Sequence, residues 1–304
     1  MKFLEQGDFN AAVAPLRTVV RLAPDTPNVF ADLGRSVMRS SQRQELLKEA
    51  ETVLARKPED VEALTIAVSA LLGKDDQRKR LGYLRTLVRL RPEDSVLKVT
   101  LAQELVNSFL YDEARPLIED LIRTDPNDPA AYYLRGQVGY FRGTDRAALA
   151  QAEADFKKTL ELRANVARTQ LFLGRVYLRQ GQAKKAIEPL SAAAERMPEN
   201  PDVHFELARA FRLIGDRETS AKAQSEFVRL REQATLAEAM AKRCGAFPED
   251  FDLHLKTARL MIRKGDPDKA IYYVNRALTI RPNDPAGMSV ARELDQILTG
   301  GGPR

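Results

Sequence analysis

The sequence predicts an all-α fold, a solenoid of antiparallel helix–turn–helix hairpins that repeat along the chain. Three observations support this prediction. Prolines followed by acidic or Asn residues recur at intervals of 34 residues, a helix breaker falls near the middle of each interval, and small residues return at two fixed phases within it. A period of about 20 to 50 residues is typical of repeat architectures, in which neighbouring units bury each other's apolar faces.

The prolines mark the end of each unit. Proline lacks a backbone N–H and clashes with the preceding turn, so a helix ends before it. The Asp or Asn two residues later is expected to cap the next helix, and in three units a second proline then occupies the first helical position. These closing prolines are Pro24, Pro58, Pro92, Pro126, Pro198, Pro248 and Pro282.

A second breaker divides each unit into two helices joined by a tight turn. Glycine at this phase allows the left-handed conformation that ends a helix. The glycines are Gly7, Gly143, Gly181, Gly215 and Gly265, and the phase is occupied elsewhere by Ser41, Asp75 and Phe109.

Small residues at two phases let the paired helices approach closely. With each closing proline numbered 32, position 8 holds Gly34, Val68, Ala102, Gly136, Gly174, Ala208 and Ala258. Position 20 holds Ala12, Leu46, Arg80, Ala114, Ala152, Ala186, Ser220 and Ala270. Val68 and Arg80 make the unit from Val61 to Pro92 the weakest of the series.

The segment from Leu171 to Pro201 resembles a tetratricopeptide repeat, with Gly174, Ala186 and Pro198 at the family's small and proline positions. This resemblance implies a right-handed superhelical solenoid that binds a protein or peptide, with the first helix of each hairpin lining the concave wall.

The predicted organisation is a single solenoid over residues 1–304. A half-truncated first repeat covers 1–26, and five or more regular repeats cover 27–232, with a four-residue insertion near 143–152. A helical insertion covers 233–247, a last repeat 248–284, and a capping helix and tail 285–304. Because the first helix is cut at Met1, we expect a segment of a larger bacterial protein whose native N-terminus is missing.

The stretch from Glu218 to Cys244 contains neither proline nor glycine. We expect one helix of roughly 26 residues there, or two with a bend near Gln233. Its apolar residues drift round the helix instead of keeping one narrow stripe. It is therefore interpreted either as a spacer or as a docking or self-association surface.

The composition points away from catalysis. One cysteine, Cys244, excludes an internal disulfide and supplies no metal-ligand cluster, and no apolar run is long enough to span a membrane. No phosphate-binding loop or hydrolase motif occurs, so we expect a soluble, cytoplasmic or periplasmic non-enzyme without a cofactor. His204 and His254 are interpreted as structural, and Cys244 as an inert thiol.

A candidate peptide groove follows positions 5, 9 and 12 of the first helices, which share one helix face. It combines apolar residues with an arginine row, so the expected partner is a protein or peptide with acidic and hydrophobic residues. The predicted groove residues are Tyr133, Gln137, Tyr140, Leu171, Arg175, Phe205, Arg209, Arg212 and Arg259. Alternatively, some of them pack between adjacent hairpins.

Four other functions remain open or are disfavoured. The carboxylate-clamp group of the family needs Lys at position 5 and Asn at position 9, a pair that no unit contains. An RNA-binding helical repeat is disfavoured by the apolar residues at position 5, so no nucleic-acid partner is expected. The remaining alternatives are a regulatory repeat region of an enzyme or export machinery, and self-association.

Overall fold

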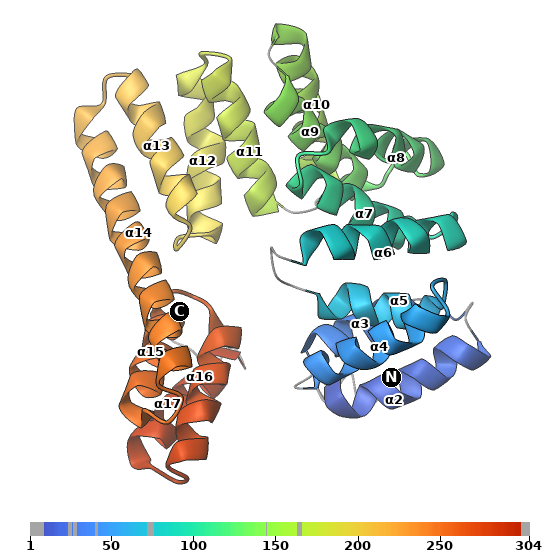
Figure 1. The fold of residues 1–304 in the computed structure, drawn as a ribbon. Coiled ribbons are helices and arrows are strands. Elements are labelled where there is room, and N and C mark those ends of the chain that lie inside the picture. Colours follow the sequence, from blue (N-terminus) through green and yellow to red (C-terminus); the bar gives the residue numbers. More distant parts are fainter. Residues whose placement is uncertain are drawn as a thin grey trace. The chain divides into compact units, whose positions relative to one another are not determined.

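A computed structural model describes residues 9–23, 26, 29–39, 42–71, 76–143, 145–162 and 166–298, which form sixteen helices and no strand (Figure 1). The all-α prediction is therefore confirmed for this part of the chain. The helices divide into two compact units, Met1–Ala164 (unit 1) and Asn165–Arg304 (unit 2), and each is described by itself. The single array over 1–304 and its subdivision stay predictions.

Unit 1 begins with α2 and the pair α3–α4, and three further hairpins follow, α5–α6, α7–α8 and α9–α10. The first member of each hairpin is called the A helix and the second the B helix. The helices are α2 (Phe9–Leu22), α3 (Val29–Arg39), α4 (Arg43–Arg56), α5 (Val61–Ala70), α6 (Gln77–Leu90), α7 (Ser95–Asn107), α8 (Tyr111–Thr124), α9 (Pro129–Arg142) and α10 (Arg146–Glu161).

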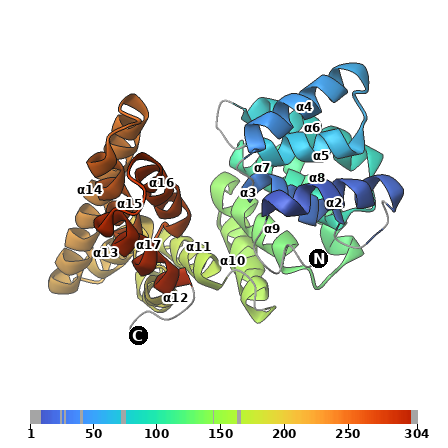
Figure 2. The same cartoon turned by 90° about the horizontal axis from the view of Figure 1, so that it is seen from below.

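Unit 2 continues with three hairpins and a last helix, α17, which packs against α15 and α16 (Figure 2). The helices are α11 (Val166–Arg179), α12 (Ala183–Arg196), α13 (Pro201–Leu213), α14 (Arg217–Ala246), α15 (Phe251–Arg263), α16 (Pro267–Ile280) and α17 (Pro285–Leu298). No helix among the described residues is both long and apolar enough to cross a membrane.

The predicted capping residues and first-position prolines at the helix starts are confirmed. The side chains two residues after the closing prolines accept hydrogen bonds from backbone N–H groups of the first helical turn, which would otherwise lack partners. The prolines predicted at the first helical position are the first residues of α9, α13 and α17. The capping residues are Asp60, Asp94, Asp128, Asn200, Asp250 and Asp284.

The left-handed turns are confirmed at Gly181, Gly215 and Gly265, whose φ angles are 74°, 88° and 69°. Phe109 occupies the same phase with φ 60° although it carries a bulky side chain. L-residues lose about 1–2 kcal/mol in this conformation, so the α7–α8 turn holds local strain.

Gly143 contradicts the left-handed prediction, because its φ is −68°. Glycine is required at this position because neighbouring atoms leave no room for a side chain. A Cβ atom there would lie 2.3 Å from the Gly139 carbonyl oxygen and 2.5 Å from the Ala148 Cβ. The predicted breakers Gly7, Ser41 and Asp75 lie outside the described residues, as do Pro24, the missing proline position at 164, the stub Met1–Gln6 and the tail 299–304.

Close approach of the paired helices explains the small residues. A Cβ on Gly136 would lie 2.7 Å from the Phe156 ring, and one on Gly174 would lie 2.4 Å from Leu190 Cγ. Phe156 and Leu190 are both fully buried, so each glycine leaves the space that a large side chain of the partner helix fills.

Arg80 shows how a large residue fits at position 20. Its Nε donates to the Val68 carbonyl oxygen at 3.0 Å, and its guanidinium also pairs with Glu104. Ser220 occupies position 20 in unit 2 and donates to the Ala208 carbonyl oxygen at 2.8 Å. A polar side chain at this phase therefore satisfies a carbonyl of the facing A helix.

The long segment after Asp216 forms one helix, α14, of 30 residues, so the alternative with a bend near Gln233 is wrong. The expected drift of the apolar residues agrees with Leu236, which is 52% exposed, but the buried residues share one face. Leu230, Ala237 and Cys244 are the buried positions, and their spacing of seven keeps them on one narrow seam. Figure 1 shows α14 (orange) running from its contact with α13 to its contact with α15.

Candidate functional site

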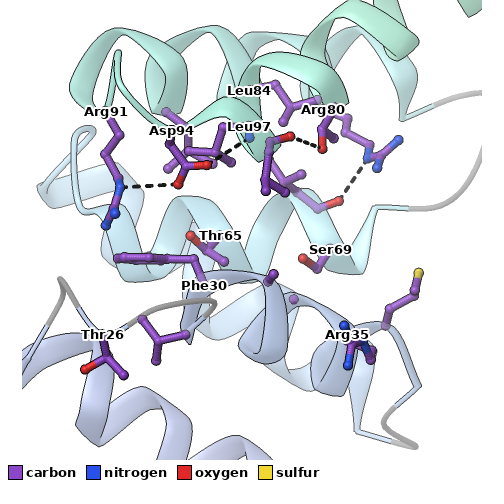
Figure 3. Close-up of a pocket in the computed structure, with 18 residues that line it drawn as sticks. Thr26, Phe30, Arg35, Thr65, Ser69, Arg80, Leu84, Arg91, Asp94 and Leu97 are labelled. Carbon is purple, nitrogen blue, oxygen red and sulfur yellow. Dashed lines mark hydrogen bonds and ion pairs between the residues drawn. The ribbon is translucent and has the colours of Figure 1, made fainter. Parts of the chain in front are cut away.

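The predicted groove face lines a cavity of about 460 Å³ in unit 1, between α3, α5 and α7 (Figure 3). Its lining includes positions 5, 9 and 12 of α3 and positions 5 and 9 of α5. These residues are Ala31, Arg35, Met38, Thr65 and Ser69. Cavities of this volume are in the range that accommodates ligand side chains.

Short side chains explain why the face is hollow here. A Cβ on Gly34 would lie 2.7 Å from the Ser69 hydroxyl oxygen, so glycine is needed for α3 to approach α5. The Ser69 hydroxyl makes no hydrogen bond to any described residue. Phe30, Leu84 and Leu87 supply apolar surface to the cavity.

The charged groups of the cavity already have partners. The Arg91 guanidinium lies 4.0 Å from the centre of the Phe30 ring and 3.6 Å from the Asp94 carboxylate. Asp94 in turn accepts the Leu97 N–H, and Figure 3 shows this chain of contacts above α5. The cavity therefore offers apolar surface and hydroxyl groups more than free charge.

Sequence reasoning did not select the α3–α5 residues because it favoured large aromatic and arginine side chains. The signal in the sequence that could have found them is a cluster of small side chains, not of large ones. Ala31, Gly34, Thr65 and Ser69 are small residues clustered on the groove face, and small residues leave space where large ones fill it.

The three groove residues predicted on α9 are mostly enclosed by their own hairpin. Tyr133 is 6% exposed and packs edge-on against Phe156, with ring centroids 6.0 Å apart. Gln137 is 8% exposed and donates to the Tyr133 hydroxyl oxygen at 3.3 Å. Tyr140 is half-buried, and its ring centroid lies 5.1 Å from that of Phe141.

In unit 2, two of the predicted arginines are paired with acids. Arg175 lies 3.0 Å from Glu206 and 2.9 Å from Asp202, both on the next A helix, α13. Arg209 lies 3.5 Å from the same Glu206, whose side chain is only 7% exposed. Leu171 is buried. The structure thus brings Arg175 and Arg209 together around one carboxylate.

The other three predicted residues of unit 2 are exposed. Phe205 is 42% exposed, and its ring centroid lies 5.3 Å from that of Phe227 on α14. Arg212 and Arg259 are exposed, and neither side chain pairs with a described residue. Of the predicted arginines, these two have donors available to a partner.

The polar residues that could suggest chemistry have structural roles. His204 and His254 each direct Nε2 at the carbonyl oxygen of the preceding closing proline, at 2.7 and 3.0 Å. Tyr132 makes the same contact through its hydroxyl, at 3.1 Å from the Pro126 oxygen. These rings occupy position 4 and tie one hairpin to the next. The described residues contain no cluster of potential metal ligands.

Cys244 is a buried thiol, 3% exposed. Burial raises its pKa above the ordinary value, and a contact of 3.2 Å with the Thr257 hydroxyl opposes this only in part. A reactive cysteine needs a lowered pKa and access to solvent. The interpretation as an inert thiol is consistent with this burial and stays a prediction.

Comparison with known proteins agrees with this geometry. The model of the tetratricopeptide repeat family matches residues 99–156, 145–201, 171–235 and 232–285. The chicken (Gallus gallus) protein DnaJ homolog subfamily C member 3 is 18% identical over 273 residues, which cover 86% of this chain and 53% of that protein. The chain spans about half, or less, of the curated relatives it matches.

Two solved structures share the fold. The Cut9–Hcn1 structure from the APC/C hetero-tetramer has a TM-score of 0.56 and 15% identity, covering 94% of this chain and 52% of that one. A monomeric mutant of IFIT1 with Gppp-AAAA has a TM-score of 0.51 and 16% identity, covering 97% of this chain and 68% of that one.

Proposed function

Because this chain belongs to the tetratricopeptide repeat family, we propose that it is a protein-interaction scaffold whose A helices bind a peptide segment of a partner protein. One observation carries this proposal. The face predicted to form the groove lines a cavity of about 460 Å³ on two successive A helices of unit 1, α3 and α5, and other positions of α6 and α7 complete the lining. A hollow built by repeated positions suits an extended or helical segment that contacts several repeats in turn.

The cavity takes an apolar side chain of the partner. Its own arginines are engaged, and its surface combines Val29, Phe30 and Met38 with the Ser69 hydroxyl, which bonds to no described residue. The hydroxyl is suited to hydrogen-bond the backbone of the bound segment. In unit 2, taken by itself, acidic residues of a partner find a complement in Arg212 and Arg259, which are exposed and pair with no described residue.

The buried members of the predicted groove then support the surface from beneath. Tyr133 and Leu171 fill their hairpins, and Arg175 with Glu206 fixes α13 against α11. We propose binding rather than catalysis, because both histidines and the thiol are engaged in packing and turn contacts.

A random-peptide display selection on the full chain tests the proposal. We expect enrichment of peptides with apolar and acidic residues, and loss of at least about tenfold in affinity when Thr100→Trp fills the cavity. Thr100 lines the cavity and donates its hydroxyl to the carbonyl four residues earlier. Thr86→Trp is the matched control, because Thr86 makes the same local bond on α6 outside the cavity.

Circular dichroism and thermal unfolding of both variants establish that they are folded. The proposal fails if no peptide is enriched above bare support. The assignment of the cavity fails if the enriched peptides bind the two tryptophan variants equally well.

A further inference from the structure

A second hollow, of about 530 Å³, lies in unit 2, is open to solvent and is lined by α14, α15 and α17. It forms where the second half of the long helix continues past α13 and meets the last hairpin. Its lining residues, here called the basic pocket, are Leu236, Met240, Lys256, Arg259, Leu260, Arg263 and Glu293.

Three cations stand on one face of α15. Lys256, Arg259 and Arg263 are separated by three and four residues, so their side chains are neighbours on the helix surface. All three are exposed, and none pairs with a described residue. Glu293 is the single acidic residue in the lining.

This arrangement differs from that of Arg175 and Arg209. Those two arginines share the Glu206 carboxylate, whereas the basic pocket holds three cations and the single carboxylate of Glu293, with which none of the three forms an ion pair. Like charges at these spacings destabilise a helix. The pocket therefore presents an uncompensated positive charge that an acidic ligand would neutralise.

The floor and one wall of the pocket are apolar. Leu260 is buried beneath the cations, and Leu236 on α14 is 52% exposed. Met240 lies one helical turn further along α14, on the same face as Leu236. A flexible methionine beside an exposed leucine forms a surface that adapts to apolar side chains.

We propose that the basic pocket binds an acidic peptide segment of a partner protein, with an apolar side chain between Leu236 and Met240 and flanking carboxylates on the α15 cations. Arginine suits this role because its planar group binds a carboxylate through two parallel hydrogen bonds. This inference rests on the proposed scaffold function. It assigns the second half of α14 to partner binding, a role beyond that of a spacer.

A peptide fits these observations better than single-stranded RNA. Single-stranded nucleic acid is typically held by aromatic side chains on which its bases stack. No aromatic residue lines the basic pocket, and its apolar part is aliphatic. Charge together with an aliphatic floor matches a segment in which Asp or Glu alternates with Leu.

Labelled synthetic peptides test the pocket on the full chain by fluorescence polarisation. The probe carries alternating Glu and Leu in a Gly-Ser host. One counterpart replaces every Glu by Gln, and another replaces every Leu by Ser. We expect the probe to bind and both counterparts to bind at least about tenfold more weakly, because each loses one half of the match.

A triple variant, Lys256→Gln with Arg259→Gln and Arg263→Gln, should weaken the Glu-Leu probe by at least about tenfold. The matched control is Lys184→Gln with Arg196→Gln and Arg217→Gln. It removes the same charge from exposed residues of unit 2 that lie outside the pocket and pair with no described residue, so it should change binding far less. Leu236→Ser with Met240→Ser should weaken the probe without changing charge.

Four results would overturn the inference: no binding of the Glu-Leu probe, equal binding of either counterpart, equal loss in both triple variants, or tighter binding of polyuridine RNA than of the probe. The pocket assignment fails while the scaffold function stands if two results coincide. Peptides from the display selection still bind the triple variant of the pocket, and the Glu-Leu probe binds this variant as tightly as the unmodified chain. If no peptide of either kind binds, both fail.

Discussion

Replacing Gly174 with alanine tests whether the repeats depend on close approach between paired helices. The added methyl carbon would lie 2.4, 2.6 and 3.3 Å from three carbon atoms of the fully buried Leu190 side chain. Gly82, inside α6, is the reference, because a methyl group there meets no atom within 4 Å. The two substitutions are chemically identical and differ only in the space available.

The structure predicts a packing cost for Gly174→Ala and none for Gly82→Ala. Alanine gains about 1 kcal/mol over glycine in a helix interior, so Gly82→Ala should stabilise its hairpin by about that amount. Gly174→Ala has the same gain but also forces Leu190 to move, and overpacking of this kind costs about 1–3 kcal/mol. The difference between the two variants, about 1–3 kcal/mol, isolates the packing cost.

Hydrogen exchange measured by mass spectrometry suits this comparison, because repeat proteins open locally and a single global transition would average the effect. Peptides from α11–α12 report on Gly174, and peptides from α5–α6 report on Gly82. Leu190→Ala completes a double-mutant cycle, since Gly174→Ala should become stabilising once the large side chain is absent. Equal stabilisation by both glycine substitutions, with no coupling to Leu190, would refute the close-approach argument.

Three further predictions concern single residues. Phe109→Gly should raise the free energy of unfolding by about 1 kcal/mol in urea titration, because φ is 60° and the side chain is 73% exposed; a lower value would show that ring packing outweighs strain. Cys244 should resist alkylation until urea opens the α14–α15 contact, and native labelling at the rate of a free thiol would contradict its burial. Burial would raise the pKa of Glu62, but hydrogen bonds from Arg21 and Arg17 hold it below its usual value. Its contribution to stability is therefore present above about pH 4.3 and lost as pH falls through the lowered pKa. Glu62→Gln should weaken the acid sensitivity of urea unfolding in unit 1, and an unchanged pH profile would show that this carboxylate is not responsible.

The repeat architecture could be predicted because it depends on local chemistry. Capping by Asp60 and Asp250, and the left-handed turns at Gly181 and Gly265, involve residues only a few positions apart. Such features follow from side-chain type and spacing. Gly143 is the exception. Glycine is needed there because a Cβ atom would collide with other atoms of the same hairpin, and not because of the backbone angle of Gly143.

The accessible part of the groove could not be predicted in the same way, because it depends on packing against facing helices of the same and the next hairpin. Tyr133 and Phe205 share position 5, yet one is 6% and the other 42% exposed. Arg175 and Arg259 share position 9, but only Arg175 faces an acid, Glu206, on the following A helix. An acidic residue at position 6 of the following repeat is the signal that would have marked Arg175 as paired.

The long helix also separates two of the contacts described above. Phe227, which contacts Phe205, and Leu236, which lines the basic pocket, are nine residues apart on α14. At 1.5 Å per residue this separation is about 13 Å. Nine residues are also about two and a half turns, so the two side chains lie on opposite sides of α14. One side of this helix packs against its own hairpin and the other lines the basic pocket, so the same helix serves both.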